Sequence, residues 1–206
     1  MKPAGHKIYL ASKSPRRREL LRQIGVEFEL LLLRDQSPRG PEVSEEVHPG
    51  EKAEDYVARV TREKAEYASN TMSWRRLPVR PVLAADTTVV IDGRILGKPA
   101  DAAEATEMLK ALSGRTHRVL TSVAVHYDED TWQTTQVSEV TFGELTDEMI
   151  RAYCATPEPY DKAGGYAIQG QAAVFIKNIS GSYSGIMGLP LYETADLLRQ
   201  AGIPIP

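Results

Sequence analysis

The sequence has only one cysteine, Cys154, among its 206 residues. A single cysteine can form neither an intrachain disulfide nor a cysteine-based metal cluster, which favours a reducing compartment. No stretch approaches the roughly 18 uninterrupted apolar residues that a membrane-spanning helix needs. Residues 1–6 also lack the apolar run of a signal peptide. We therefore expect a cytoplasmic protein that makes no membrane contact.

The chain also lacks an excess of positive charge. Its formal net charge is −3 at pH 7, so there is no overall basic surface for a nucleic-acid polymer, and any anionic partner is expected to be small. The four histidines show no spacing typical of metal ligands. A hydrophobic content of 42% over this length can form a sizeable core, and we interpret residues 1–206 as a single domain.

Hydrophobic spacing predicts helices that alternate with strands. The expected helices cover residues 15–24, 52–68, 101–112, 147–154 and 191–201. The expected strands cover residues 8–11, 27–33, 82–85, 89–91, 116–127, 132–142 and 172–179, and polar loops are expected at 34–50 and 70–81. The strand, helix and strand at the start are typical of α/β folds. The two long runs at 116–127 and 132–142 predict an antiparallel pair.

Residues 10–21 run from a short apolar strand into a helix that begins with three arginines. Ser14 is a good N-cap, and Pro15 suits the first helical position. Cations are disfavoured at a helix N-terminus, so three of them there indicate a bound anion. The free N–H groups, Ser12 and the guanidinium groups together suit a phosphate or a carboxylate. A solvated basic helix end is the alternative.

Asp86 lies between two apolar strand segments, which is an unusual place for an acid. It is either a structural residue that bonds to neighbouring backbone or threonines, or a functional carboxylate that binds a divalent cation or takes a proton from water. The Lys98 side chain lies between Gly97 and Pro99 just after a predicted Asp92-Gly93 hairpin turn.

Three other features have both structural and functional interpretations. Residues 113–117 are expected to end a helix, although their N–H groups suit an anion as well. The charged, glycine-containing segment 158–165 predicts a tight functional turn. His117 is expected to be a packed or solvated side chain rather than a catalytic base.

Taken together, these segments resemble the Maf family of nucleoside triphosphate pyrophosphatases over nearly the whole chain. The matching motifs lie at residues 10–21, 62–65, 85–87, 97–99, 112–117, 158–165 with 168–170, and 181–183 with 188–190. The resemblance implies a mixed α/β fold, similar to that of the inosine triphosphate pyrophosphatases, with a curved sheet, flanking helices and two lobes around a central cleft.

The implied reaction hydrolyses a nucleoside triphosphate to the monophosphate and pyrophosphate with a divalent cation, Mg²⁺ or Mn²⁺. In such a family Asp86 activates water, while Arg17, Lys64 and Lys98 hold and neutralise the triphosphate. The family usually carries an Asp-Glu pair after the second strand; here Ser44 replaces the aspartate, and Glu45 is the nearest equivalent of a metal ligand or catalytic acid. Asp86 and Glu45 are thus the candidate metal ligands, and the resemblance also implies a homodimer.

Three positions resemble the branch of the family that acts on dTTP and UTP. They are Arg16, Thr87 and Gln169, and the branch that acts on 7-methyl-GTP differs at all three. A glutamine amide both donates and accepts, which suits the imide edge of thymine or uracil. Two alternatives stay open: the same reaction on 7-methyl-GTP or another non-standard purine nucleotide, and a nucleotide-binding regulator of septum formation.

Overall fold

The computed structural model describes residues 6–33 and 43–205. In this part of the chain one seven-stranded sheet forms the centre of the molecule, with the strand order β2-β1-β3-β5-β6-β7 and β4 paired to β3. The strands are β1 (Ile8–Leu10), β2 (Phe28–Leu30), β3 (Val82–Ile91), β4 (Arg94–Leu96), β5 (Thr116–Tyr127), β6 (Asp130–Phe142) and β7 (Ile176–Ser180). β1 runs parallel to β2 and β3, and the other pairs are antiparallel. The expected mixed α/β class is confirmed.

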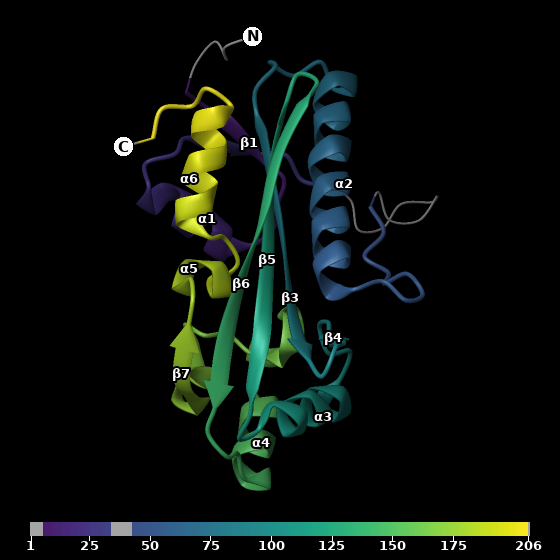
Figure 1. Ribbon diagram of the computed structural model, residues 1–206, viewed down its shortest axis with the longest axis vertical. Coiled ribbons are helices and arrows are strands. Elements are labelled where there is room, and N and C mark those ends of the chain that lie inside the picture. The colour runs from purple at the N-terminus through teal and green to yellow at the C-terminus, as the bar shows by residue number, and fades with distance from the viewer. Residues whose placement is uncertain (1–5, 34–42, 206) are drawn as a thin grey trace.

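Helices cover the sheet and gather at its ends. They are α1 (Pro15–Gln23), α2 (Ala53–Trp74), α3 (Ala102–Leu112), α4 (Asp147–Cys154), α5 (Tyr183–Met187) and α6 (Leu191–Gln200), with 3₁₀ turns η1 (Glu158–Asp161), η2 (Ala163–Gly165) and η3 (Gln171–Phe175). Figure 1 shows α2 along one side of the long strands and α6 along the other. Within the described residues, no helix combines the length and apolar character that crossing a bilayer requires.

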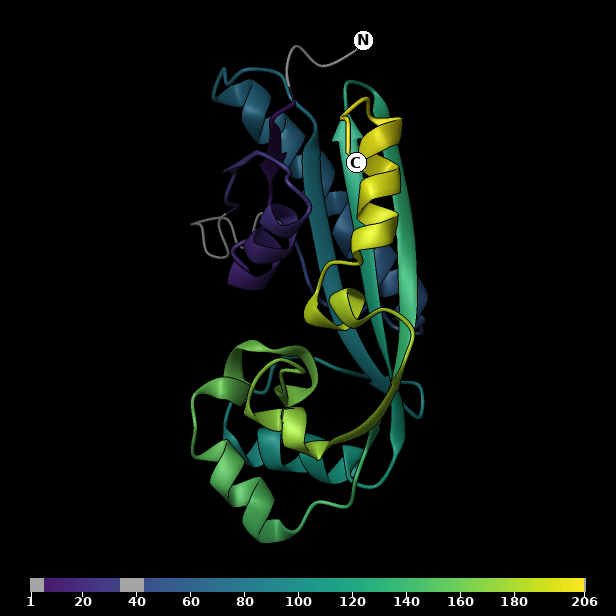
Figure 2. The ribbon, with the colours of Figure 1, turned by 90° about the vertical axis from the view of Figure 1, so that its left-hand side faces the viewer.

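The long strands β3, β5 and β6 connect two lobes (Figure 2). The first lobe contains β1, β2, α1, α2 and α6. The second lobe contains β4, β7, α3, α4 and the 3₁₀ turns, and its core is a cluster of apolar side chains that includes Phe142 and Phe175. On the first lobe, α1 and α6 cover one face of the sheet with Leu21 and Leu198, while α2 covers the opposite face with Ala65 and Ala68.

Three helices begin at residues that are typical N-caps. Ser14, Asp101 and Thr146 are the N-caps of α1, α3 and α4, and each side chain accepts a hydrogen bond from a backbone N–H three residues later. The Asp92-Gly93 turn joins β3 and β4 as an antiparallel hairpin, as expected. Positions 113–115 end α3, since Gly114 adopts a φ of 66° there.

Four boundaries were wrong. The strand expected at 27–33 is only Phe28–Leu30. The helix expected to end at 68 continues to Trp74, into the segment expected to be a loop, because Met72 packs against the core under β1. The strand expected at 172–179 begins only at Ile176; the 3₁₀ turn η3 precedes it, because the Glu158 carboxylate accepts the N–H groups of Gln171 and Ala172.

The fourth wrong boundary is the expected break around Asp86. β3 is one strand, paired with β5 at every position from Val82 to Val90. The antiparallel ladder therefore carries Asp86 within the sheet rather than at a strand end. Of the loop expected at 34–50, residues 34–42 lie outside the described residues, and residues 43–50 contain no helix or strand.

His117 is a packed side chain, as expected. It is 2% exposed, its Nε2 lies 2.7 Å from the Tyr166 hydroxyl, and its ring contacts Phe142 edge to face. Burial lowers the pKa of the imidazole from 6.5 to about 4. The folded protein therefore holds His117 neutral at a pH where the unfolded chain protonates it.

This difference predicts a pH-dependent stability. At pH above 6.5 the contribution of the neutral ring is fully present, and it is lost as the pH falls from 6.5 towards 4, because only the unfolded chain binds the proton. Replacing His117 by Phe should flatten the decline of Tm over this range, as measured by thermal unfolding. Phe175→Leu, in the same cluster, should lower Tm without changing its pH dependence. An equal decline in His117→Phe and the wild type would contradict the assignment.

Candidate active site

The site is built around a gap in one edge of the sheet. On this edge β1 pairs with β3 only as far as Leu83, and β4 begins to pair at Val89. Within the described residues, positions 85–88 of β3 therefore have a strand neighbour on the β5 side alone. Since successive side chains of a strand point to opposite faces of the sheet, Asp86 and Thr87 project from opposite faces of the sheet beside this gap.

A cavity of about 880 Å³ opens at the gap, between the two lobes. All nine residues singled out in the sequence line it: Ser12, Arg16, Arg17, Glu45, Lys64, Asp86, Thr87, Lys98 and Gln169. Among the described residues, the charged lining consists of six cations, Lys13, Arg16, Arg17, Lys64, Lys98 and Lys162, and four acids, Glu45, Glu46, Asp86 and Asp161. This described lining carries an excess of positive charge in a protein whose net charge is −3, which favours an anionic ligand.

On the α2 face of β3, one lysine lies between two carboxylates. Lys64 Nζ is 2.8 Å from Asp86 Oδ1 and 2.6 Å from Glu45 Oε1. Burial alone would lower the pKa of the Lys64 ammonium, but the charges of Asp86 and Glu45 outweigh it, so that the pKa is raised. Lys64 is therefore a fixed positive charge, and it holds both carboxylates at the cavity wall.

On the opposite face, the Arg17 guanidinium is held by three acceptors. Its Nε donates to the Gly188 carbonyl at 2.7 Å, Nη1 to Ser12 Oγ at 3.1 Å and Nη2 to Thr87 Oγ1 at 3.2 Å. An arginine has five N–H groups, so two of them stay available to a ligand. Burial lowers the pKa of Arg17 while the charge of Asp86 opposes this shift, and a guanidinium stays protonated in either case.

The close approach of α5 to Arg17 depends on a glycine. Gly188 has a φ of 119°, in the left-handed region, and it ends α5 just where its carbonyl accepts from Arg17. Residues other than glycine are strained at such a φ, because their Cβ atom clashes with the backbone. The 188–190 motif of the sequence is therefore part of the frame that holds Arg17.

The remaining predicted residues enter the cavity from three other segments. Arg16 lies half-buried on α1. Burial would raise the pKa of Asp161 in the second lobe, but the contact with Lys162 and, to a smaller extent, the charge of Arg16 lower it. Lys98 follows β4 and is exposed; within the described residues it forms no ion pair. Gln169, also exposed, lies between η2 and η3.

The segment 158–165 has a mixed role. Glu158 is structural, because its carboxylate accepts from the Tyr153 hydroxyl and from two backbone N–H groups. Asp161 and Lys162 line the cavity. Gly164 has a φ of 70°, and a Cβ there would lie 2.9 Å from Val89 Cγ2, so the turn packs directly against β3.

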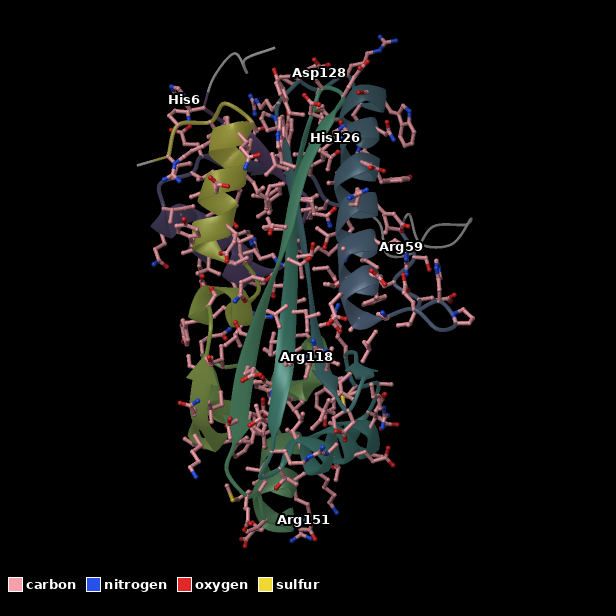
Figure 3. All side chains as sticks on the ribbon, viewed as in Figure 1. His6, Arg59, Arg118, His126, Asp128 and Arg151 are labelled. Atoms are coloured by element: carbon pink, nitrogen blue, oxygen red, sulfur yellow. The ribbon has the colours of Figure 1, made fainter. Side chains whose placement is uncertain are left out.

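The sequence did not indicate what holds Glu45 in place. The Tyr56 hydroxyl donates to the Glu45 carbonyl at 3.1 Å. Arg59 donates to the Glu46 carbonyl at 2.9 Å and to both carboxylate oxygens of Glu51, at 2.7 and 2.9 Å. Figure 3 labels Arg59 on the side of α2 that faces this loop. Tyr56 and Arg59 are three residues apart and therefore lie on the same face of α2. The sequence shows this spacing, but it does not indicate that the two side chains hold the loop with Glu45.

The fold and the cavity define a mixed α/β protein with a cation-lined cleft between two lobes. The chain belongs to the Maf family: the family model described as Maf-like protein matches residues 7–201. A dTTP/UTP pyrophosphatase from Aromatoleum aromaticum is 56% identical over 206 residues, covering 100% of both chains.

Other relatives carry the same name. The dTTP/UTP pyrophosphatase of Nitrosomonas europaea is 52% identical and covers 98% of each chain; that of Ralstonia nicotianae is 56% identical and covers 96% of this chain and 95% of its own. Among solved structures, a HAM1 protein from Coxiella burnetii is 19% identical, covers 97% of this chain and 95% of that chain, and has a TM-score of 0.46.

The bonds of Arg59 predict a local stabilisation of the loop that carries Glu45. Replacing Arg59 by Met removes charge-assisted hydrogen bonds that hold this loop closed. The hydrogen exchange rate of backbone amides in residues 46–51 should therefore rise by about tenfold. Mass spectrometry of the exchanged peptides measures this rate. Arg62→Met is the matched control, because Arg62 lies on the same helix and its side chain donates to Gln133 Oε1 at 3.0 Å, away from the Glu45 loop. Equal exchange in the two variants would contradict the prediction.

Proposed function

We propose that this protein is a nucleoside triphosphate pyrophosphatase that hydrolyses dTTP and UTP to the monophosphate and pyrophosphate. The observation that carries the proposal is the Asp86–Lys64–Glu45 array inside a cationic cavity. A volume of about 880 Å³ lies in the range of small-molecule sites. Full-length relatives with the name dTTP/UTP pyrophosphatase support the choice of substrate.

In the proposed reaction, Asp86 accepts a proton from water as the water oxygen attacks the α-phosphorus. The bond from this phosphorus to the bridging oxygen breaks, and pyrophosphate leaves with the negative charge. Lys64 keeps the Asp86 carboxylate in place, while the two available N–H groups of Arg17 and the exposed Lys98 ammonium bind phosphate oxygens. Phosphoryl chemistry of this kind depends mainly on positioning and on positive charge.

The residues present fit a divalent cation that arrives with the nucleotide. Mg²⁺ in nucleotide enzymes is held by one or two carboxylates together with substrate phosphates. Asp86 and Glu45 are two carboxylates at one cavity wall, and each contacts Lys64 through one of its two oxygens in the bonds above. The described residues form no cluster of three or more metal-binding side chains. When bound, the cation would neutralise phosphate charge and polarise a phosphoryl oxygen.

The remaining expectations stay proposals. They include a single domain over residues 1–206, a homodimer, a cytoplasmic location, and recognition of the pyrimidine base by Arg16, Thr87 and Gln169 with Ser12 in the phosphate site. The last of these, the assignment of base and phosphate recognition, is supported by the lining of one cavity by all four side chains.

A substrate panel tests the proposed function. With Mg²⁺ or Mn²⁺, dTTP and UTP should release pyrophosphate with a kcat/KM at least about tenfold above that for 7-methyl-GTP and inosine triphosphate. A chelator should abolish release, and added metal should restore it. A preference for a purine would refute the assignment of the base-selecting positions. Nucleotide binding without turnover would favour a regulatory protein instead.

The role of Asp86 as the base predicts a large loss of turnover. Asp86→Asn keeps the size of the side chain but removes its basicity, so kcat for dTTP should fall by about a hundredfold or more. Asp92→Asn is the matched control, because Asp92 lies in the β3–β4 turn and pairs with Arg115 outside the cavity. Unchanged turnover in Asp86→Asn, measured by pyrophosphate release, would exclude Asp86 as the base.

A further inference from the structure

A chain of hydrogen bonds runs from Arg17 through two threonines to the backbone of α5. Arg17 Nη2 lies 3.2 Å from Thr87 Oγ1, which lies 3.0 Å from Thr121 Oγ1, and Thr121 Oγ1 lies 2.7 Å from the Gly185 carbonyl oxygen. Thr121 is directly opposite Thr87 in the β3–β5 ladder. It is fully buried at 0% exposure and does not line the cavity, whereas Thr87 does.

The chemistry of the two ends fixes the direction of every bond in the chain. A carbonyl oxygen only accepts, so Thr121 must donate its single proton to Gly185. Thr121 then has no proton left for Thr87, and Thr87 must donate to Thr121. A guanidinium only donates, so Arg17 uses one lone pair of the Thr87 oxygen. The Thr87 hydroxyl therefore has its proton committed and one lone pair left to face the cavity.

We propose that Thr121 is a positioning residue that makes Thr87 a pure hydrogen-bond acceptor towards the nucleobase, and that this polarity selects bases with an imide N–H. The inference rests on the proposed function and adds a residue that determines which pyrimidine base is selected. Thymine and uracil carry a hydrogen on N3, whereas N3 of cytosine is a bare acceptor. Two acceptors facing each other leave both without a partner, which costs binding energy.

Gln169 alone cannot supply this selectivity. Its amide carries both a donor and an acceptor, and the side chain is exposed, so a rotation of the amide pairs it with the edge of either thymine or cytosine. The Thr87 hydroxyl cannot exchange its donor and acceptor roles in the same way, because it donates its proton to the buried Thr121 hydroxyl on the neighbouring strand. Thr121 thus discriminates thymine and uracil from cytosine, although it does not contact the nucleotide itself.

Removing the Thr121 hydroxyl tests the inference. In Thr121→Val the Thr87 proton is released and can turn towards the cavity. The ratio of kcat/KM for dTTP to that for dCTP should then fall by roughly fivefold or more, the value of one ordinary hydrogen bond. Thr121→Ser keeps the hydroxyl and should keep the wild-type ratio. Thr116→Val is the matched control, because it removes a Thr–Thr bond to Thr141 between strands β5 and β6, outside the cavity.

A double variant shows whether Thr121 acts through Thr87. In a Thr87→Val background there is no hydroxyl to orient, so adding Thr121→Val should leave the dTTP to dCTP ratio unchanged. A further change of similar size in that background would overturn the inference. A measurement on the wild-type protein avoids the question of folding: N3-methyl-dTTP, which lacks the imide hydrogen, should be hydrolysed no better than dCTP, and hydrolysis equal to that of dTTP would overturn the inference.

Failure of the proposed function is a separate result. A wild-type protein without activity on any nucleotide overturns the proposed function and the inference that rests on it. A wild-type protein that prefers dTTP and UTP, together with a folded Thr121→Val variant that keeps the same preference, overturns the inference alone.

Discussion

The structure of the site depends on one constraint, the placement of a carboxylate inside a β-sheet. Asp86 is partly buried in β3 and directly follows the buried residues 82–85, and a carboxylate there requires a cationic partner. Lys64 supplies it from α2 at 2.8 Å. This contact explains why α2 must cross the sheet next to the gap between β1 and β4. It also explains why the loop with Glu45 is tied to the same helix, since Glu45 makes the second contact with Lys64.

The strand β3 divides the cavity wall into two chemically different sides. Asp86 faces α2 and belongs to a charged array of an acid, a lysine and a second acid. Thr87 faces α1 and α5 and belongs to a chain of directed hydrogen bonds. The period of a strand imposes this division, because adjacent residues cannot point to the same face. Two consecutive residues therefore contact two different helices, and the cleft between the lobes is where both sides open to one ligand.

Part of this arrangement could be predicted from the sequence. The Ser14 cap and the three following arginines indicated an anion site, and Asp86 was conspicuous as an acid between apolar segments. Resemblance to a family gathered the nine candidates, and the structure brings all of them to one cavity. The contact partners could not be predicted, since register and helix crossing decide them. Thr121 is the best example: it was one polar residue in a long strand until the register placed it opposite Thr87.

In the proposed mechanism, the division of the wall separates the residues assigned to the reaction from the residues assigned to base selection. Asp86 and Glu45, on the α2 face, are linked through Lys64, because both carboxylates contact its ammonium group. On the other face, Thr121 of β5 and the Gly185 carbonyl of α5 set the direction of the Thr87 proton, while Arg17 donates to the same hydroxyl oxygen. Under the proposed roles, replacing Thr121 would change which base edge is accepted without altering the charge beside Asp86. On this proposal, exchanging threonines and glutamines would change the preferred base while the acid and the lysines stay the same, because the two sets of residues lie on opposite faces of β3.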